Sequence, residues 1–358
     1  MKPRLASSSL INITQLTWKS GALDVPHFIL EALNDRFPQA KLVVIAEKAR
    51  LGIPTKDIGW SFQPALTHAA GSELTHFDFQ PLTVNQFYDD FKADLVSMLT
   101  RNKVLRYLQV FPDIPMDKKY PEMLEVFQAS ELPAPKELYL YEQKIQLFTQ
   151  RELSIWESKR GWENLTSLGL SHAEHLIAFV GTTPRLEVLA MAPSGRADYN
   201  QFEKAFNTLD VERPFGSVRN FTYRGLLNHV EAPQGRRIVP WCILKHLPDL
   251  KFLDIARFRY DSVCPGPILD VSNTSDITGI RDLCPNLETF RLDVALTGPY
   301  AEWPYDVLTE LAHFKKSLIL SLFLHRMKTR RARIRNNCMD YLAVGQHVRN
   351  ERRRLGLP

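Results

Sequence analysis

The sequence has little of what would place it in a membrane or outside the cell. Its densest apolar stretch, from Leu318 to Leu324, is far shorter than the roughly 20 residues that a membrane-spanning helix needs. Residues 1–10 contain no apolar core of the kind that a secretory signal has. The four cysteines form no C-x-x-C pair, and no histidines stand at a zinc-binding spacing. These absences predict a cytoplasmic or nuclear protein with reduced thiols, no membrane span, and no metal or other cofactor.

Sequence signatures of common enzymes are missing as well. There is no G-x-S-x-G, H-E-x-x-H, kinase-type, P-loop or G-x-G-x-x-G sequence in a suitable context. Ser171, His172 and His175 are close in sequence but lack a third partner, so we expect them to be surface or loop residues. We therefore predict that the protein is not an enzyme. A catalyst would need titratable groups that only the fold brings together.

A short apolar pattern recurs along most of the chain. It reads apolar, two residues, apolar, one residue, apolar, as in Leu165, Leu168 and Leu170. Ten copies start at positions 13, 42, 74, 105, 135, 165, 186, 218, 250 and 287. The poorest copy starts at Leu42, with Ile45 in its middle slot and Glu47 in its last. The residue between the middle and last slots is never Leu, Ile, Val, Phe or Met, and this alternation predicts short strands with one buried face.

The segments between these strands have apolar residues at helical spacing, which predicts helices. They include Pro26–Leu33, Val84–Leu99, Glu174–Val180, Phe202–Leu209, Ile238–Leu247 and Trp303–Phe314. A repeated strand and helix predict an α/β fold, specifically an irregular leucine-rich-repeat-like solenoid with a parallel concave sheet and outer helices. We expect about ten units over residues 1–325. The alternative is an ordinary α/β domain in which the spacing is coincidental.

The residues that alternate with the buried ones are expected to line the concave face of such a solenoid. Tyrosine and arginine are frequent among them, and both are enriched where proteins bind proteins. We expect this face to bind a protein partner whose identity the sequence does not reveal. The candidate partner-binding residues are His76, Asp78, Tyr107, Gln109, Tyr139, Tyr141, Asn220, Thr222, Arg224, Asp254, Arg291 and Asp293.

The positive charge of the chain is concentrated in its last residues. Residues 326–354 carry a charge of +8, which leaves about −3 for the remainder of a chain with net charge +5. Apolar residues at three- or four-residue steps predict a basic amphipathic helix over residues 326–358. This helix could cap the last repeat, bind nucleic acid or act as a nuclear-localisation signal, or touch an acidic membrane. Its basic residues are Lys328, Arg330, Arg331, Arg333, Arg335, Arg352, Arg353 and Arg354.

Several segments resemble the repeat region of fungal F-box and leucine-rich-repeat proteins. These are Leu16-Thr-Trp18, Val25–Leu33, Arg36–Leu42, Cys284–Leu292 and Glu302–Leu308. Such a resemblance implies a substrate receptor of a cullin-type ubiquitin ligase, which binds the ligase through an Skp-type adaptor. The helical F-box should precede the repeats, but the first copy already starts at Ile13, so we expect no F-box within these residues. Adaptor binding is therefore a weaker expectation than binding of a protein partner.

Two functions follow from these patterns. The first is a non-catalytic protein-interaction scaffold, in its narrower form a substrate receptor of the F-box kind. The second is a nucleic-acid-associated protein that works through its basic C-terminal helix. Positive charge confined to that helix favours the first function, whereas positive charge along the concave face would favour the second.

Overall fold

A computed structural model describes residues 14–20, 27–37, 41–46, 76–81, 91–110, 120–141, 146–192, 203–204, 207–208, 215–223, 239–255, 274–296, 304–316, 319–326 and 339–357. The chain divides into two compact units, Met1–Arg185 and Leu186–Pro358. The predicted extent of a single solenoid through residue 325 stays a prediction.

The first unit alternates strands and helices along the chain. Its strands are β1 (Gln15–Ser20), β2 (Lys41–Ala46), β3 (His76–Pro81), β4 (Tyr107–Val110), β5 (Glu137–Leu140) and β6 (Ser167–Leu170). Its helices are α1 (His27–Arg36), α3 (Phe91–Arg101), α4 (Leu124–Ala129), α5 (Gln150–Ser158) and α6 (Ala173–Ile177). Each strand from β1 to β6 pairs in parallel with the next one in sequence. Parallel neighbours require a crossover connection, and α1, α3, α4 and α5 lie in such connections between successive strands.

The second unit follows the same order. Its strands are β7 (Val188–Met191), β8 (Asn220–Tyr223), β9 (Phe252–Asp254), β10 (Thr289–Leu296) and β11 (Ile319–Arg326), again parallel and in sequence order. Its helices are α8 (Trp241–Leu244), α9 (Thr274–Leu283), α10 (Tyr305–Ala312) and α11 (Met339–Arg354). The expected α/β fold with a parallel sheet is thus confirmed.

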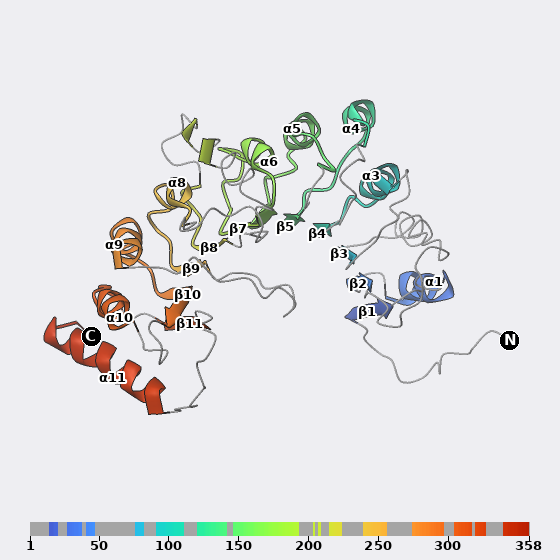
Figure 1. Cartoon of the computed structure of the whole chain (residues 1–358). Helices are drawn as coiled ribbons and strands as arrows, with labels where there is room; N and C mark the ends of the chain where they lie inside the picture. The colour runs from blue at the N-terminus through green and yellow to red at the C-terminus, as the bar shows by residue number, and fades with distance from the viewer. Residues whose placement is uncertain are drawn as a thin grey trace. The chain divides into compact units, whose positions relative to one another are not determined.

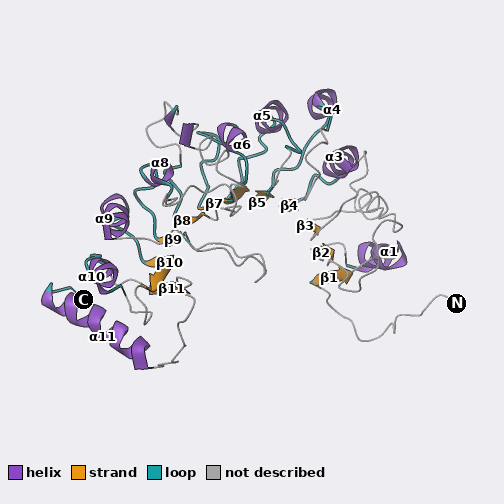
Figure 2. Cartoon of the chain, viewed as in Figure 1, coloured by secondary structure: helices purple, strands orange, loops and turns teal. Residues whose placement is uncertain are grey.

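In each unit, helices gather on one side of the strands. Helices α3, α4, α5 and α6 lie on the same side of β3, β4 and β5, and α8, α9 and α10 lie on one side of β8 to β11 (Figure 1). Figure 2 shows the alternation of strand, loop and helix in both units. One face of each sheet is therefore covered by helices, which agrees with the alternating pattern of the sequence.

The middle slots of the repeated pattern form the core. The register aligns Phe77, Leu108, Leu138 and Leu168 across β3 to β6, and Phe221, Leu253 and Phe290 across β8 to β10. All of them are at most 3% exposed. Burying each such side chain contributes about 1.5–3 kcal/mol before conformational entropy is subtracted.

The register corrects the poorest predicted copy and adds a strand that was not predicted. Leu42 pairs with Leu16 and Phe77, so Leu42 occupies the middle slot and Val44 the last. The assignment of Ile45 and Glu47 to these slots was wrong by three residues, because one long apolar run offers several alternating registers. Strand β11 continues the sheet beyond the last predicted copy, with Leu320 beside Phe290.

An aromatic cluster joins α5 to the turns that follow α5 and α6 in the first unit. Trp156 and Trp162 are buried with ring centroids 5.0 Å apart, and Trp162 lies 4.7 Å from Phe179. The Trp156 indole Nε1 donates a 2.7 Å hydrogen bond to the carbonyl oxygen of Pro133. The large Trp156 ring, whose polar atom is hydrogen-bonded, fixes the position of α5 on the loop that contains Pro133.

A buried ion pair lies in the same helical layer. Lys92 of α3 is 2% exposed and Glu152 of α5 is fully buried, with Lys92 Nζ 2.8 Å from Glu152 Oε1. The carboxylate also accepts hydrogen bonds from the backbone N–H groups of Met123 and Thr149, each at 2.8 Å. Thr149 and Glu152 form a capping box at the start of α5. One carboxylate therefore ties the beginning of α5 to α3 and to the residue before α4.

Candidate functional site

Four aromatic side chains form a continuous row on the first unit. His76 and Tyr107 stack with ring centroids 5.4 Å apart and an interplanar angle of 18°. Tyr139 follows at 5.7 Å from Tyr107, and Tyr141 stacks on Tyr139 at 5.9 Å and 29°. All four are half-buried. We call His76, Tyr107, Tyr139 and Tyr141 the aromatic row.

The strand register explains why these rings meet. Along β4 and β5, burial alternates, so Leu108 and Leu138 are buried while Tyr107 and Tyr139 are only half-buried. His76 pairs with Tyr107, and Gln109 pairs with Tyr139. Parallel strands lie about 4.8 Å apart, which brings ring-bearing positions of neighbouring strands into contact. The row therefore lies on the face of the sheet opposite to its buried side.

Gly169 of β6 makes room for the end of the row. A Cβ atom at this position would lie 2.4 Å from Tyr139 Cδ1 and 2.5 Å from the hydroxyl oxygen of Tyr141. Real Cβ atoms do not approach other atoms so closely, so any larger residue would push the rings away. The glycine thus allows both tyrosines to lie against the backbone of β6.

Hydrogen bonds hold the tyrosine rings in place. The Tyr107 hydroxyl donates to Gln109 Oε1 at 2.8 Å, and the Tyr139 hydroxyl donates to Glu137 Oε2 at 3.3 Å. Burial raises the pKa of Tyr139 above its usual value, and the negative charge of Glu137 acts in the same direction. The phenol therefore stays neutral and keeps its proton for the carboxylate. Glu137 and Gly169 were not among the predicted residues, although the alternation about Leu138 and Leu168 indicated that they share this face.

The predicted residues of the second unit form a smaller group. Asn220 and Thr222 of β8 are half-buried, and Arg291 of β10 is 44% exposed. The Arg291 guanidinium lies 5.2 Å from the centre of the Phe252 ring and 3.8 Å from Asp254 Oδ2. Asp254 is only 4% exposed, in contrast to the open position expected for it. The neighbouring strand explains the difference, because β10 places Arg291 directly beside Asp254.

Some predicted residues cannot be placed. Asp78 and Asp293 occupy positions in β3 and β10, and nothing is described of their side chains. Arg224 lies outside the described residues, as do Lys328, Arg330, Arg331, Arg333 and Arg335. Of the predicted basic patch, only Arg352, Arg353 and Arg354 are described, at the end of α11.

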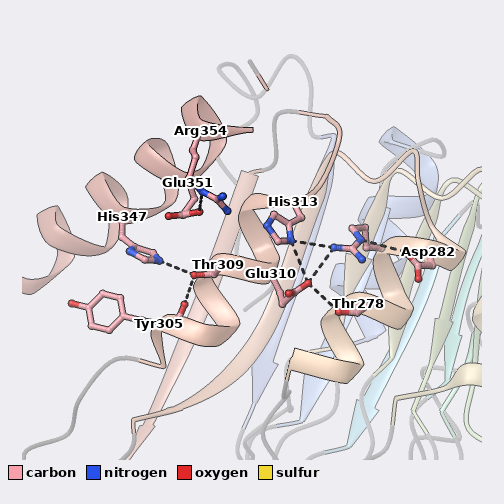
Figure 3. Close-up of polar contacts among 10 residues, drawn as sticks. Thr278, Asp282, Tyr305, Thr309, Glu310, His313, His347, Glu351 and Arg354 are labelled. Carbon is pink, nitrogen blue, oxygen red and sulfur yellow. Dashed lines mark hydrogen bonds and ion pairs between the residues drawn. The ribbon is translucent and has the colours of Figure 1, made fainter. Parts of the chain in front are cut away.

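Helix α11 packs against α10 through polar contacts (Figure 3). The His347 ring nitrogen Nε2 lies 3.0 Å from the Thr309 hydroxyl, and the same ring meets Tyr305 edge-on at 5.1 Å. Arg352 Nη1 donates a 2.9 Å hydrogen bond to the carbonyl oxygen of Phe314. One predicted basic residue thus serves attachment of the helix. Such packing fits the capping role expected of a terminal segment.

A second polar cluster joins α9 to α10. Glu310 accepts hydrogen bonds from Thr278 at 3.0 Å and from Arg281 at 3.1 Å, and His313 Nδ1 lies 3.4 Å from the same carboxylate oxygen (Figure 3). The Arg281 and Glu310 side chains are each 25% exposed. This cluster connects the consecutive helices α9 and α10, and its side chains contact one another.

The prediction that Ser171, His172 and His175 are surface or loop residues is correct only in that Ser171 and His172 lie in the turn after β6, whereas His175 belongs to α6 and none of the three is at the surface. All three are buried, and His175 is completely so. Its Nε2 atom lies 2.7 Å from the carbonyl oxygen of Phe148, and burial lowers the pKa of His175 to about 3, with a smaller contribution from His172. A neutral imidazole that donates to a backbone oxygen has a structural role. The turn after β6 runs inward here, which no local pattern indicated.

The cysteines that the structure describes are buried thiols. Cys242 and Cys284 are both free. Burial raises the pKa of Cys242 to about 11 and that of Cys284 to about 12. Neither is therefore a nucleophile at neutral pH, because only the thiolate is reactive.

The aromatic row remains the main candidate for a functional site. No protein-family model matches the chain, and no curated protein sequence matches it. Among the described residues, no group of three or more His, Cys, Asp or Glu side chains is arranged to hold a metal ion. No helix in the described part of the chain is long and apolar enough to cross a membrane.

Proposed function

We propose that this protein is a non-catalytic interaction scaffold that binds a partner protein on the aromatic row. The observation that carries the proposal is the row itself, in which four half-buried rings are held in contact at 5.4–5.9 Å. Tyrosine brings a large contact area and a polar group at little cost in conformational entropy. Rings already fixed by Gly169 and by hydrogen bonds lose little more freedom on binding.

The finer architecture that we propose is a leucine-rich-repeat-like stack within each unit. It is supported by parallel strands in strict sequence order, by an apolar middle slot in each of them, and by helices on one side. In such stacks, each repeat buries its apolar face against its neighbours and leaves the alternate positions for binding. The aromatic row occupies those alternate positions.

A role as substrate receptor of a cullin-type ubiquitin ligase is the narrower form of the proposal. It rests on the resemblance of the repeat segments to fungal F-box proteins. Affinity purification of the full chain followed by mass spectrometry tests it. Copurification of an Skp-type adaptor and a cullin would support this form, and their absence would reject it while leaving partner binding open.

Photo-crosslinking from the row tests the proposal as a whole. Gln109, which pairs with Tyr139, is replaced by the photoreactive residue benzoylphenylalanine in the full chain. We expect a discrete protein adduct in cells, and we expect Tyr139→Ser to abolish it. The same photoreactive residue at exposed Glu163 serves as the control position. Identical adducts from both positions, or none from Gln109, would contradict binding at the row.

Nucleic-acid binding through α11 is the second candidate. It is favoured by Arg349 and Arg353, which are exposed on this helix. Each phosphate contact that is lost lowers the salt dependence of binding by about one unit of slope. We would measure binding of a labelled RNA by the full chain and by Arg349→Gln/Arg353→Gln as salt is varied. Equal slopes for both proteins would remove this candidate.

A further inference from the structure

The described strand positions that carry the aromatic row include a carboxylate and no lysine or arginine. Across β3 to β6, the described positions on this face are His76, Tyr107, Gln109, Glu137, Tyr139, Ser167 and Gly169. Glu137 is half-exposed, and no ion pair to it occurs among the described residues. Asp78 holds the register position beside Gln109. Electron-rich rings beside a carboxylate attract cations.

The second unit contains an arrangement that shows what such a surface can hold. On β9, Phe252 and Asp254 stand two residues apart, and Arg291 of the adjacent strand lies over the ring and beside the carboxylate. On β5, Tyr139 and Glu137 likewise stand two residues apart. In the adjacent strand, Ser167 pairs with Glu137 and Gly169 pairs with Tyr139, so neither position carries an arginine. The first unit therefore has the ring and the carboxylate, and the two paired positions of β6 supply no guanidinium to them.

We infer that the aromatic row binds arginine side chains from an extended basic segment of the partner protein, an inference that rests on the proposed function. Arginine suits the site better than lysine. Its planar guanidinium stacks on an aromatic ring and at the same time directs paired N–H donors at a carboxylate. In an extended segment, side chains on one face recur every ~6.7 Å. This spacing is close to the 5.7 Å and 5.9 Å between successive ring centroids of the row.

The same observations disfavour a nucleic acid as the occupant. Bases stack on aromatic rings, but the phosphates that join them need positive charge nearby. The face carries Glu137 instead, and the described positions on β3 to β6 include no lysine or arginine. Nucleic acid is therefore an outcome that the experiment must be able to detect.

Fluorescence anisotropy with the full chain tests the inference. The probe is a fluorescein-labelled peptide with three arginines at alternate positions, separated by glycines and flanked by serines. Matched peptides carry lysine or citrulline in place of arginine, and a labelled oligothymidylate represents single-stranded nucleic acid. We expect the arginine peptide to bind most tightly and the citrulline peptide, which keeps the planar shape without the charge, to bind least.

Variants show whether binding occurs at the row. Glu137→Gln should lower the affinity for the arginine peptide roughly tenfold, because a hydrogen bond to a charged group is lost. Tyr139→Leu should weaken it roughly three- to tenfold. The matched controls are Glu163→Gln, at an exposed glutamate outside the row, and Tyr305→Leu, at a tyrosine of α10 that is 44% exposed. Both controls should bind as the unaltered chain does.

Three results would overturn the inference. They are no arginine-peptide binding at millimolar concentration, equal binding of arginine and lysine peptides, or tighter binding of oligothymidylate that depends on Tyr139. Tyr139→Ser could abolish the crosslinked adduct while binding of the arginine peptide is unchanged by substitutions at Tyr139 and Glu137. In that case protein binding at the row stands and arginine recognition is rejected. Absence of both the adduct and the peptide binding would reject the two proposals together.

Discussion

Lys92 and Glu152 form a buried ion pair between α3 and α5, and we expect Lys92→Met to destabilise the first unit strongly. The Glu152 carboxylate is fully buried and would keep only the two backbone N–H groups of Met123 and Thr149 as partners. Methionine fills a volume close to that of the lysine stem but cannot compensate the charge. The charged oxygens would thus stay in an apolar environment with no cation beside them.

The expected cost is about 3–5 kcal/mol, which is typical when one partner of a buried pair is removed. With a urea dependence of about 2 kcal/mol per molar, the unfolding midpoint of the first unit should fall by roughly 2 M. Tryptophan fluorescence reports this transition, because Trp156 and Trp162 lie in the same core. Hydrogen exchange of α5 locates the effect, since its capping box depends on Glu152.

Lys103→Met provides the matched control. Lys103 pairs with Glu131 on the surface, where both side chains are more than half exposed. Water and salt screen such pairs, so the urea midpoint should not change measurably. If Lys92→Met and Lys103→Met shift the urea midpoint equally, or if neither shifts it, the buried ion pair does not stabilise the first unit by the expected amount.

Three further predictions concern other parts of the chain. The pKa of His175 is lowered from its unfolded value near 6.5 to about 3. The folded state therefore loses stability as pH falls from 6.5 towards 3, by about 1.4 kcal/mol per pH unit from this group. The urea midpoints at pH 7 and pH 5 should differ less in His175→Gln than in the unaltered chain. Gly169→Ala should displace the rings of Tyr139 and Tyr141 at a cost of about 1–3 kcal/mol and reduce crosslinking at the row. Arg352→Ala should speed hydrogen exchange in α11, because its bond to Phe314 is lost, by an amount that corresponds to about 1.5–3 kcal/mol.

Each of these predictions has an outcome that would contradict it. An unchanged pH dependence in His175→Gln would mean that other groups cause the acid sensitivity. Crosslinking that survives Gly169→Ala would mean that the position of the rings against β6 does not matter for binding. Unaltered exchange in α11 would mean that Arg352 does not hold this helix on α10, and the capping interpretation would lose its main contact.

The sequence by itself determined most of the strands, their buried face and their parallel order, although not β11. Buried apolar residues alternate within each strand, as in Leu108 and Val110, and the same alternation returns in the next strand at Leu138 and Leu140; this pattern favours parallel strands with one buried face. It also indicated Tyr107, Tyr139 and Tyr141 as surface positions of one sheet. Where the apolar run is continuous, as at Leu42, the register was ambiguous and only the pairing of neighbouring strands resolved it.

Tertiary structure decided which of those positions form a site. Contact between Tyr139, Tyr141 and Gly169 depends on which strand lies beside which, as does the covering of Asp254 by Arg291. The burial of His175 and the pairing of Lys92 with Glu152 join residues that are far apart in sequence or that lie in irregular turns. A pattern in the sequence indicates only the periodicity within each helix or strand. The distances between side chains of different elements arise only when the chain packs, because packing is set by the shapes and charges of all neighbours at once.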